Sequence, residues 1–308
     1  MAKSGSPRIA MTAPDHYEVT YTINPWMQPD TWARDPKSAN QTARAQWLAL
    51  KSTLERIGFT VDVIPGVAGL PDMLFPANAA IIFERRAMLA RFRYPQRTGE
   101  EAHFRRYLLD LHERGLLDEI AELSPGLNQE GAGDCIWDTK REVFWAGFGP
   151  RSDAWALSEV TNFFQRGVVA LLLATEHYYH LDTCFKALPG GEILYFPGAF
   201  AERSAKLIVD MVASELLIAV TAEEAASFCL NIVELGRDLV MAPPPSRIRT
   251  ILEERGYRCH EVDLSSFILS GGAAYCMTLR LDLLSSPHVD IAKEGETSCS
   301  PRISPTPL

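Results

Sequence analysis

The chain has 308 residues, of which 47% are hydrophobic and 22% charged, a composition typical of a globular protein with a large core. Its net charge of −9 disfavours nucleic acid and anionic membranes as partners, and is compatible with a small cationic molecule. Because the sequence contains neither an apolar run of membrane-spanning length nor a secretory leader pattern, we expect a cytoplasmic protein without a membrane partner, and leave a homo-oligomer open.

Predicted strands and helices alternate along the chain. A strand at 8–11 is followed by a helix at 38–57, which ends at Gly58, and by an alternating strand at 59–64. From there a unit of hairpin, helix and strand recurs. The hairpins are expected at 79–92, 135–146, 183–196 and 232–242, the helices at 100–114, 153–166, 201–213 and 245–255, and further strands at 168–173, 216–220 and 257–262.

A last hairpin is incomplete, because Tyr275 to Leu283 forms one predicted strand with no partner after it. The strand at 8–11 is available as that partner and would close a ring without exposed edges. The repeats recur at roughly 45 to 60 residues, near the range of propellers and arrays. We expect one catalytic domain at 8–284, a flexible segment at 1–7 and a disordered tail at 285–308; the alternative is an open α/β sheet.

Polar residues stand at the start of each predicted hairpin. They are Asp72 and Asn78, Asp134, His180 with Asp182, Asn231 and Cys276, in chain order. In a ring of repeated units these positions would face one centre. The pattern therefore predicts a polar site where the hairpins begin.

Cys276 is the candidate nucleophile. It follows the small residues Ser270-Gly271-Gly272-Ala273-Ala274, which permit close approach of a ligand to the backbone. The six cysteines contain no CxxC pair, so we expect free thiols and neither a metal nor another cofactor. The alternative is a buried structural thiol.

His180 and Asp182 are two positions apart, and at strand spacing they would share a face. Such a histidine would help a thiol to ionise, and the carboxylate would hold a cation. The alternative is a surface histidine beside a capping aspartate.

The segment Glu130-Gly131-Ala132-Gly133-Asp134 places a carboxylate at the end of a glycine-rich turn. It lacks the Lys or Ser/Thr of a phosphate-binding loop. A carboxylate there suits a guanidinium, whose planar fork matches two oxygens. The alternative is a turn without a ligand.

Together, the Asp134 turn, the segment from His180 to Thr183 and the late Cys276 resemble the guanidine-modifying superfamily. This superfamily includes arginine deiminases, dimethylarginine dimethylaminohydrolases, arginine dihydrolases and amidinotransferases. The early block Tyr21-Thr22-Ile23-Asn24-Pro25-Trp26-Met27 is similar to the bacterial dihydrolase and dimethylaminohydrolase-like branch. The resemblance runs from about Arg8 to Asp282.

The resemblance implies a five-bladed α/β propeller with a central site. Cys276 would attack the guanidinium carbon and form an amidino-thioether, His180 would protonate the leaving nitrogen and then activate water, and Asp134 and Asp182 would bind the guanidinium. A thiolate suits this reaction because the bound cation favours it.

The resemblance also implies residues that bind the rest of the substrate. Arg93 and Arg151 match arginines that hold the substrate carboxylate, and Asp72 matches a contact to polar groups; the alternative is solvated surface side chains. Asn78 stands where citrulline-forming relatives tend to carry acids. An uncharged amide at this position resembles the arginine dihydrolases; the alternative is neutral variation within the family.

We expect a cysteine-dependent hydrolase of arginine or a methylated arginine, which releases ornithine or citrulline with ammonia or an alkylamine. One alternative is an amidinotransferase that passes the amidino group to an amine. Another is a non-catalytic protein that binds arginine as a regulator.

Overall fold

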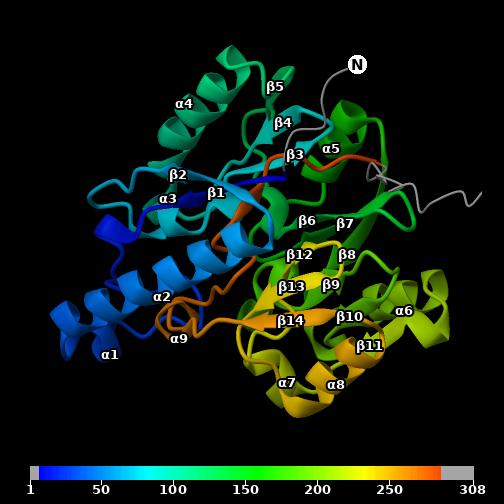
Figure 1. Cartoon of the computed structure of the whole chain (residues 1–308). Helices are drawn as coiled ribbons and strands as arrows, with labels where there is room; N and C mark the ends of the chain where they lie inside the picture. Colours follow the sequence, from blue (N-terminus) through cyan, green and yellow to red (C-terminus); the bar gives the residue numbers. More distant parts are fainter. Residues whose placement is uncertain (1–6, 286–308) are drawn as a thin grey trace, which may run out of the picture.

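The computed structural model describes residues 7–285, so nearly all of the expected flexible amino-terminal segment and carboxy-terminal tail lies outside the described residues. Five three-stranded sheets make up the interior (Figure 1). The strands are β1 (Arg8–Thr12), β2 (Thr60–Ile64), β3 (Ala80–Phe83), β4 (Arg86–Leu89), β5 (Glu119–Glu122), β6 (Cys135–Asp138), β7 (Val143–Phe148), β8 (Gly167–Leu172), β9 (Phe185–Ala187), β10 (Ile193–Tyr195), β11 (Leu217–Ala219), β12 (Val233–Leu235), β13 (Asp238–Met241), β14 (Arg258–Glu261) and β15 (Leu279–Arg280).

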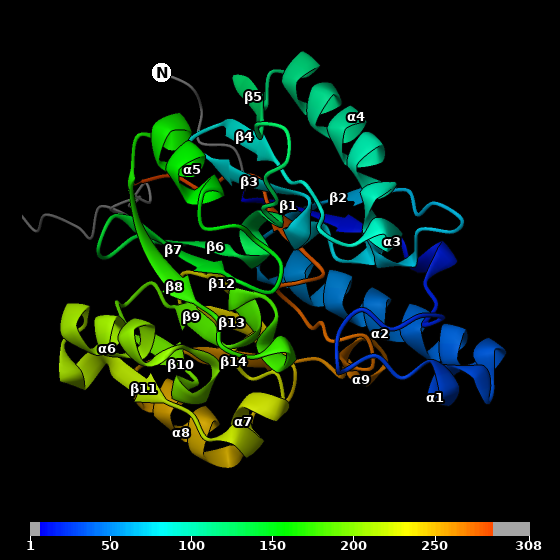
Figure 2. The ribbon, with the colours of Figure 1, turned by 180° about the vertical axis from the view of Figure 1, so that it is seen from behind.

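The larger helices lie around the strands, at the outside of the molecule in both opposed views (Figures 1 and 2). The helices are α1 (Pro29–Ala33), α2 (Pro36–Ile57), α3 (Pro95–Thr98), α4 (Glu100–Glu113), α5 (Ala156–Phe164), α6 (Glu202–Met211), α7 (Ala222–Ala226), α8 (Ser246–Glu254) and α9 (Ser265–Ile268). Within residues 7–285, none of them combines the length and the apolar character needed to cross a membrane.

All five sheets share one topology: an antiparallel strand pair is followed by a helix and then by a strand parallel to the second of the pair. The sequence predicted this unit, and it also predicted that the amino-terminal strand completes the last sheet. β1 pairs antiparallel with β15, through Ile9 and Arg280, and parallel with β2. The first and last described strands are therefore neighbours.

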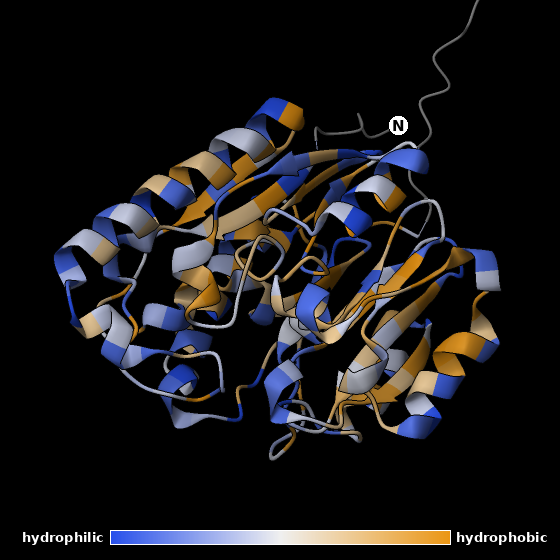
Figure 3. Cartoon of the chain, turned by 90° about the horizontal axis from the view of Figure 1, so that it is seen from below, coloured by the Kyte–Doolittle hydropathy of each residue, from blue (hydrophilic) through white to orange (hydrophobic). Residues whose placement is uncertain are grey.

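Helix α2 illustrates why the sequence folds in this way. Asp35 caps its first turn by accepting a hydrogen bond from the Ser38 amide, and Gly58 ends it in the left-handed conformation, with φ of 117°. Trp47, Leu50 and neighbours at helical spacing are buried on one face. Figure 3 shows the same division more widely, with hydrophobic colouring concentrated on the strands and on the helix faces turned toward them.

The five sheets also share a central space. A small pocket is lined by residues from every sheet. These residues include Ile9 of β1, Ile82 of β3, Ile136 of β6, Lys186 of β9 and Val233 of β12. Strands of all five sheets therefore contribute to one pocket.

The prediction and the structure differ at two strands, of which one is shorter than predicted and the other was not predicted. The strand expected at 275–283 is only β15, because the chain first forms a turn in which Met277 and Thr278 donate amide hydrogen bonds to the carbonyls of Ala273 and Tyr275. Strand β5 was not predicted, since its sequence Glu-Ile-Ala-Glu has only two apolar residues. It is ordered instead by parallel pairing with β4.

Candidate active site

Three hairpins begin just after a 3₁₀ turn, and these turns carry polar residues of the site. The turns are η3 (Pro76–Asn78), η4 (Gly131–Gly133) and η6 (Leu181–Thr183). They pack so closely that a Cβ at Gly133 would collide with the amide nitrogen of Asn78. Glycine is therefore required between η3 and η6. A small cavity lies beside them, and its lining includes Asp72, Asn78, Arg97, Arg151, Tyr179 and Cys276.

Cys276 reaches this cavity from the turn before β15. Its thiol donates a hydrogen bond to Oδ2 of Asp182 at 3.1 Å, and Nδ2 of Asn231 donates to Sγ at 3.0 Å. The amide of Cys276 donates to Oδ1 of Asn231 at 3.1 Å. Burial, and then the charge of Asp182, raise the pKa of the thiol well above its usual value. Without a ligand, Cys276 is therefore a thiol rather than a thiolate.

Asp182 is buried, with 1% of its surface exposed. One oxygen accepts the Cys276 hydrogen bond, whereas Oδ1 is buried without a partner. Burial raises the pKa of Asp182 to about 7, although hydrogen bonds and Lys186 act in the opposite direction. A carboxylate oxygen left in this way beside a thiol is arranged to receive a cationic hydrogen-bond donor.

His180 belongs to a second group of contacts. Its Nε2 lies 2.7 Å from Oε2 of Glu130, and its Nδ1 lies 3.4 Å from Nδ2 of Asn78. Burial lowers the pKa of His180 to about 4, even though Glu130 acts to raise it. Burial also opposes ionisation of Glu130, but Arg151, His180 and Arg97 outweigh it and lower the pKa of Glu130. An ionised Glu130 accepts hydrogen bonds only, so neutral His180 carries its proton on Nε2.

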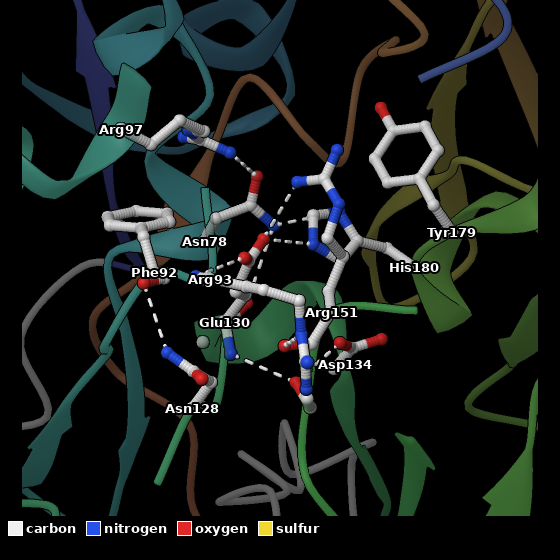
Figure 4. Close-up of polar contacts among 12 residues, drawn as sticks. Asn78, Phe92, Arg93, Arg97, Asn128, Glu130, Asp134, Arg151, Tyr179 and His180 are labelled. Atoms are coloured by element: carbon white, nitrogen blue, oxygen red, sulfur yellow. Dashed lines mark hydrogen bonds and ion pairs between the residues drawn. The ribbon is translucent and has the colours of Figure 1, made fainter. Parts of the chain in front are cut away.

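Glu130 lies between His180 and Arg151 (Figure 4). Nη1 of Arg151 donates to Oε2 of Glu130 at 3.0 Å, and the Arg93 amide donates to Oε1 at 3.0 Å. Arg151 is 1% exposed, and its guanidinium lies between the rings of Tyr94 and Tyr179, at 4.5 and 4.6 Å. The site therefore contains a buried, positively charged side chain held by aromatic faces.

Asp134, like His180 and Asp182, is not among the residues that line the cavity. Its two oxygens accept hydrogen bonds from the Ser152 hydroxyl at 2.6 Å and from the Leu181 amide at 3.0 Å. These contacts fix η6, which carries Asp182. The spacing argument for His180 and Asp182 was wrong, because Asp182 lies in η6 and His180 caps it. They contact different partners.

The two predicted arginines differ in whether they line the cavity. Arg151 lines the cavity, whereas Arg93 pairs with Asp153 and donates through Nε to the carbonyl of Arg151 at 3.1 Å. Arg93 therefore orders the Arg151 loop instead of facing the cavity. Asp72 and Asn78 line the cavity as expected, and Asp72 accepts a hydrogen bond from the Tyr21 hydroxyl at 2.9 Å.

Arg97 was not assigned to the site from the sequence. Asn231 was placed among the polar hairpin starts, but neither it nor Glu130 was given a role. Arg97 is buried against Glu100 and donates to Oδ1 of Asn78 at 2.8 Å. Arg97 lies in the short helix α3, and nothing in the sequence singled it out, since a lone arginine is usually solvated. Glu130 and Asn231 occupy the same kind of hairpin start as the predicted residues, and this position was the available signal.

Among residues 7–285, no cluster of three or more His, Cys, Asp or Glu side chains is arranged to hold a metal ion.

Comparison with known proteins places this arrangement in a family. The family described as N,N dimethylarginine dimethylhydrolase, eukaryotic, matches residues 16–283. The bifunctional arginine dihydrolase/ornithine cyclodeaminase ArgZ of Synechocystis sp. is 36% identical over 290 residues, which cover 94% of this chain and 40% of ArgZ. The chain thus spans about two fifths of that relative. The N(G),N(G)-dimethylarginine dimethylaminohydrolase of Mycobacterium tuberculosis is 33% identical over 288 residues, with 91% of this chain and 90% of the relative covered.

Solved structures agree with these matches. The N-terminal domain of ArgZ bound to product superposes with a TM-score of 0.85 at 36% identity, covering 92% of this chain and 100% of that domain. A dimethylarginine dimethylaminohydrolase adduct with S-methyl-L-thiocitrulline is similar in fold, with a TM-score of 0.72 at 19% identity. The chain therefore belongs to the dimethylarginine dimethylaminohydrolase family of the guanidine-modifying superfamily.

Proposed function

We propose that the protein is a cysteine-dependent hydrolase of the guanidinium group of arginine, and that it carries the reaction through to ornithine. The observation that carries the proposal is the buried pair of Cys276 and Asp182, in which the carboxylate keeps one oxygen without a partner. A guanidinium bound there would satisfy that oxygen and present its carbon to the sulfur.

The cavity offers complementary groups for the rest of an amino-acid substrate. Asp182 would bind the guanidinium, Arg151 would hold the α-carboxylate, and Asp72 would accept hydrogen bonds from the α-amino group. All three line the cavity or contact a residue that does. A substrate of this size and charge is supported by the structures of ArgZ with bound product and of AgrE with L-arginine. AgrE is the bifunctional arginine dihydrolase/ornithine cyclodeaminase of Nostoc sp..

The first half-reaction forms a C–S bond and breaks a C–N bond. The bound cation would offset the burial that keeps Cys276 protonated, so the thiol proton would leave through His180 and end on the departing nitrogen. Ammonia leaves, and the substrate carbon remains bound to sulfur as an amidino-thioether.

The second half-reaction hydrolyses this intermediate. His180, neutral and oriented by Glu130, would take a proton from water as the water oxygen attacks the carbon. The C–S bond then breaks, and the proton returns to sulfur. The product is citrulline, and a second passage over the same residues would release ornithine, carbon dioxide and ammonia.

We also propose that the five sheets are blades of one α/β propeller with this site on its axis. The proposal is supported by the repeated topology of the sheets and by the cavity that residues of all five sheets line. On this arrangement, each hairpin start would project a side chain toward the axis.

Replacing Cys276 by Ser is expected to lower turnover of arginine by about a thousandfold or more, because a hydroxyl cannot replace the soft sulfur nucleophile. Cys259→Ser, on β14 and outside the cavity lining, should retain full turnover. Mass spectrometry of the products, with and without an amine acceptor, measures both. Transfer of the amidino group to the amine with negligible ammonia would instead identify a transferase, and unchanged ligand binding without any turnover in the parent would identify a regulator.

Asn78→Asp tests whether the reaction continues to ornithine. The change keeps the oxygen that accepts from Arg97 but removes the N–H that lies 3.4 Å from His180. That N–H is a donor for the ureido oxygen of citrulline, so the variant is expected to accumulate citrulline while the parent forms ornithine. A time course of both amino acids measures this. The same ratio of ornithine to citrulline in parent and variant would contradict the role of Asn78.

Asp182→Asn is expected to abolish turnover and yet stabilise the fold. Because the pKa of Asp182 is raised to about 7 by burial, the folded parent binds a proton that the unfolded chain releases near pH 4. Stability of the parent is therefore lost as pH rises through that interval. The free energy of unfolding of the variant should exceed that of the parent by a margin that widens from about pH 4 to about pH 7, reaching about 4 kcal/mol, and then stays constant; the melting temperatures of the two proteins measure this.

The control for this prediction is Asp210→Asn, since Asp210 forms an exposed pair with Lys206 on α6. Its melting temperature should follow that of the parent at every pH. If Asp182→Asn also follows the parent, Asp182 carries no buried charge at neutral pH.

A further inference from the structure

Three chain segments meet at Cys276, and they are tied together twice. The first set of contacts joins the segment leading into β9, the segment leading into β12 and the turn before β15, through Asp182, Asn231 and Cys276. The second set of contacts joins β9, β12 and the turn before β15, through Lys186, Glu234 and Tyr275.

Lys186 takes part in both contacts of the second set. It lies on β9 with only 2% of its surface exposed and forms an ion pair with Glu234 of β12. Its Nζ lies 4.7 Å from the centre of the Tyr275 ring, and Tyr275 directly precedes Cys276. Such a cation over an aromatic face holds both partners in place. Lys186 therefore contacts the turn that carries the nucleophile, and it lines the second cavity and not the one that Cys276 lines.

Lys186 also affects the charge of the site. The titratable groups that act on or are affected by Asp182 are Lys186, Cys276, Tyr275, Tyr179, Cys184 and Asp134. In this group Lys186 is the cation, and it lowers the pKa of Asp182 against the effect of burial. Glu234 pairs with Lys186 and partly offsets this positive charge.

We propose that Lys186 is a positioning residue that keeps Asp182 a carboxylate and holds the Cys276 turn against it, with Glu234 setting how much of the Lys186 charge reaches the site. This proposal rests on the function proposed above and names a residue that acts through Asp182 without touching the substrate. It gives the second cavity, which Lys186, Glu234 and Tyr275 line, a part in the reaction at the first.

The test measures binding of arginine to Cys276→Ser protein by calorimetry between pH 5 and pH 9, so that no turnover intervenes. Affinity should fall on the acid side of a midpoint at which Asp182 becomes protonated. Lys186→Met removes the cation while keeping an unbranched side chain, and should move that midpoint up by about one pH unit. Glu234→Gln removes the negative charge that pairs with Lys186, so the midpoint should move to lower pH.

The opposite signs separate this role from a structural one, because two purely structural lesions would weaken binding alike at every pH. Shifts in the same direction, or no shift in either variant, would overturn the proposal. If Lys186→Met does not fold, Glu234→Gln alone decides it, since Glu234 is the more exposed partner. If Cys276→Ser and parent proteins neither bind nor convert arginine or dimethylarginine, the proposed function itself is wrong, and the role of Lys186 fails with it.

Discussion

The hydrogen bond from the Cys276 thiol to Asp182 is the contact on which the rest of the site depends. Both groups are almost fully buried, and burial works against the charged form of each. Asn231 fixes the pair by binding the sulfur and amide of Cys276 and the carbonyl of Asp182. The protein thereby maintains a polar arrangement that is costly when the cavity is empty and that a bound cation would relieve.

The fold makes this arrangement possible by supplying its members from separate repeats. Each hairpin starts at a turn, and the turns are tied by buried contacts such as those of Asp134 with Ser152 and Leu181. The thiol, the imidazole and the carboxylates are therefore held by contacts between segments that are distant in sequence.

Much of the fold could be predicted from the sequence, since apolar alternation, helix ends at glycine and the unpaired strand near residue 8 are local signals. Cys276, Asp72, Asn78 and Arg151 were predicted to meet, and they line one cavity; their roles stay predictions. Arg97, Glu130 and Asn231 received no role from the sequence, because what distinguishes them is burial and a partner distant in sequence. The contacts of Asp134 and Arg93 could not be predicted for the same reason. Both occupy expected positions in the chain, but their side chains bind neighbouring loops.

The central claim is that Cys276 becomes covalently bound to substrate carbon during turnover. The most direct measurement is mass spectrometry of protein quenched with acid while it converts arginine, followed by peptide mapping. The account predicts an added mass equal to the substrate less one ammonia, confined to the peptide that contains Cys276. Turnover without any adduct, or an adduct on another cysteine, would contradict it.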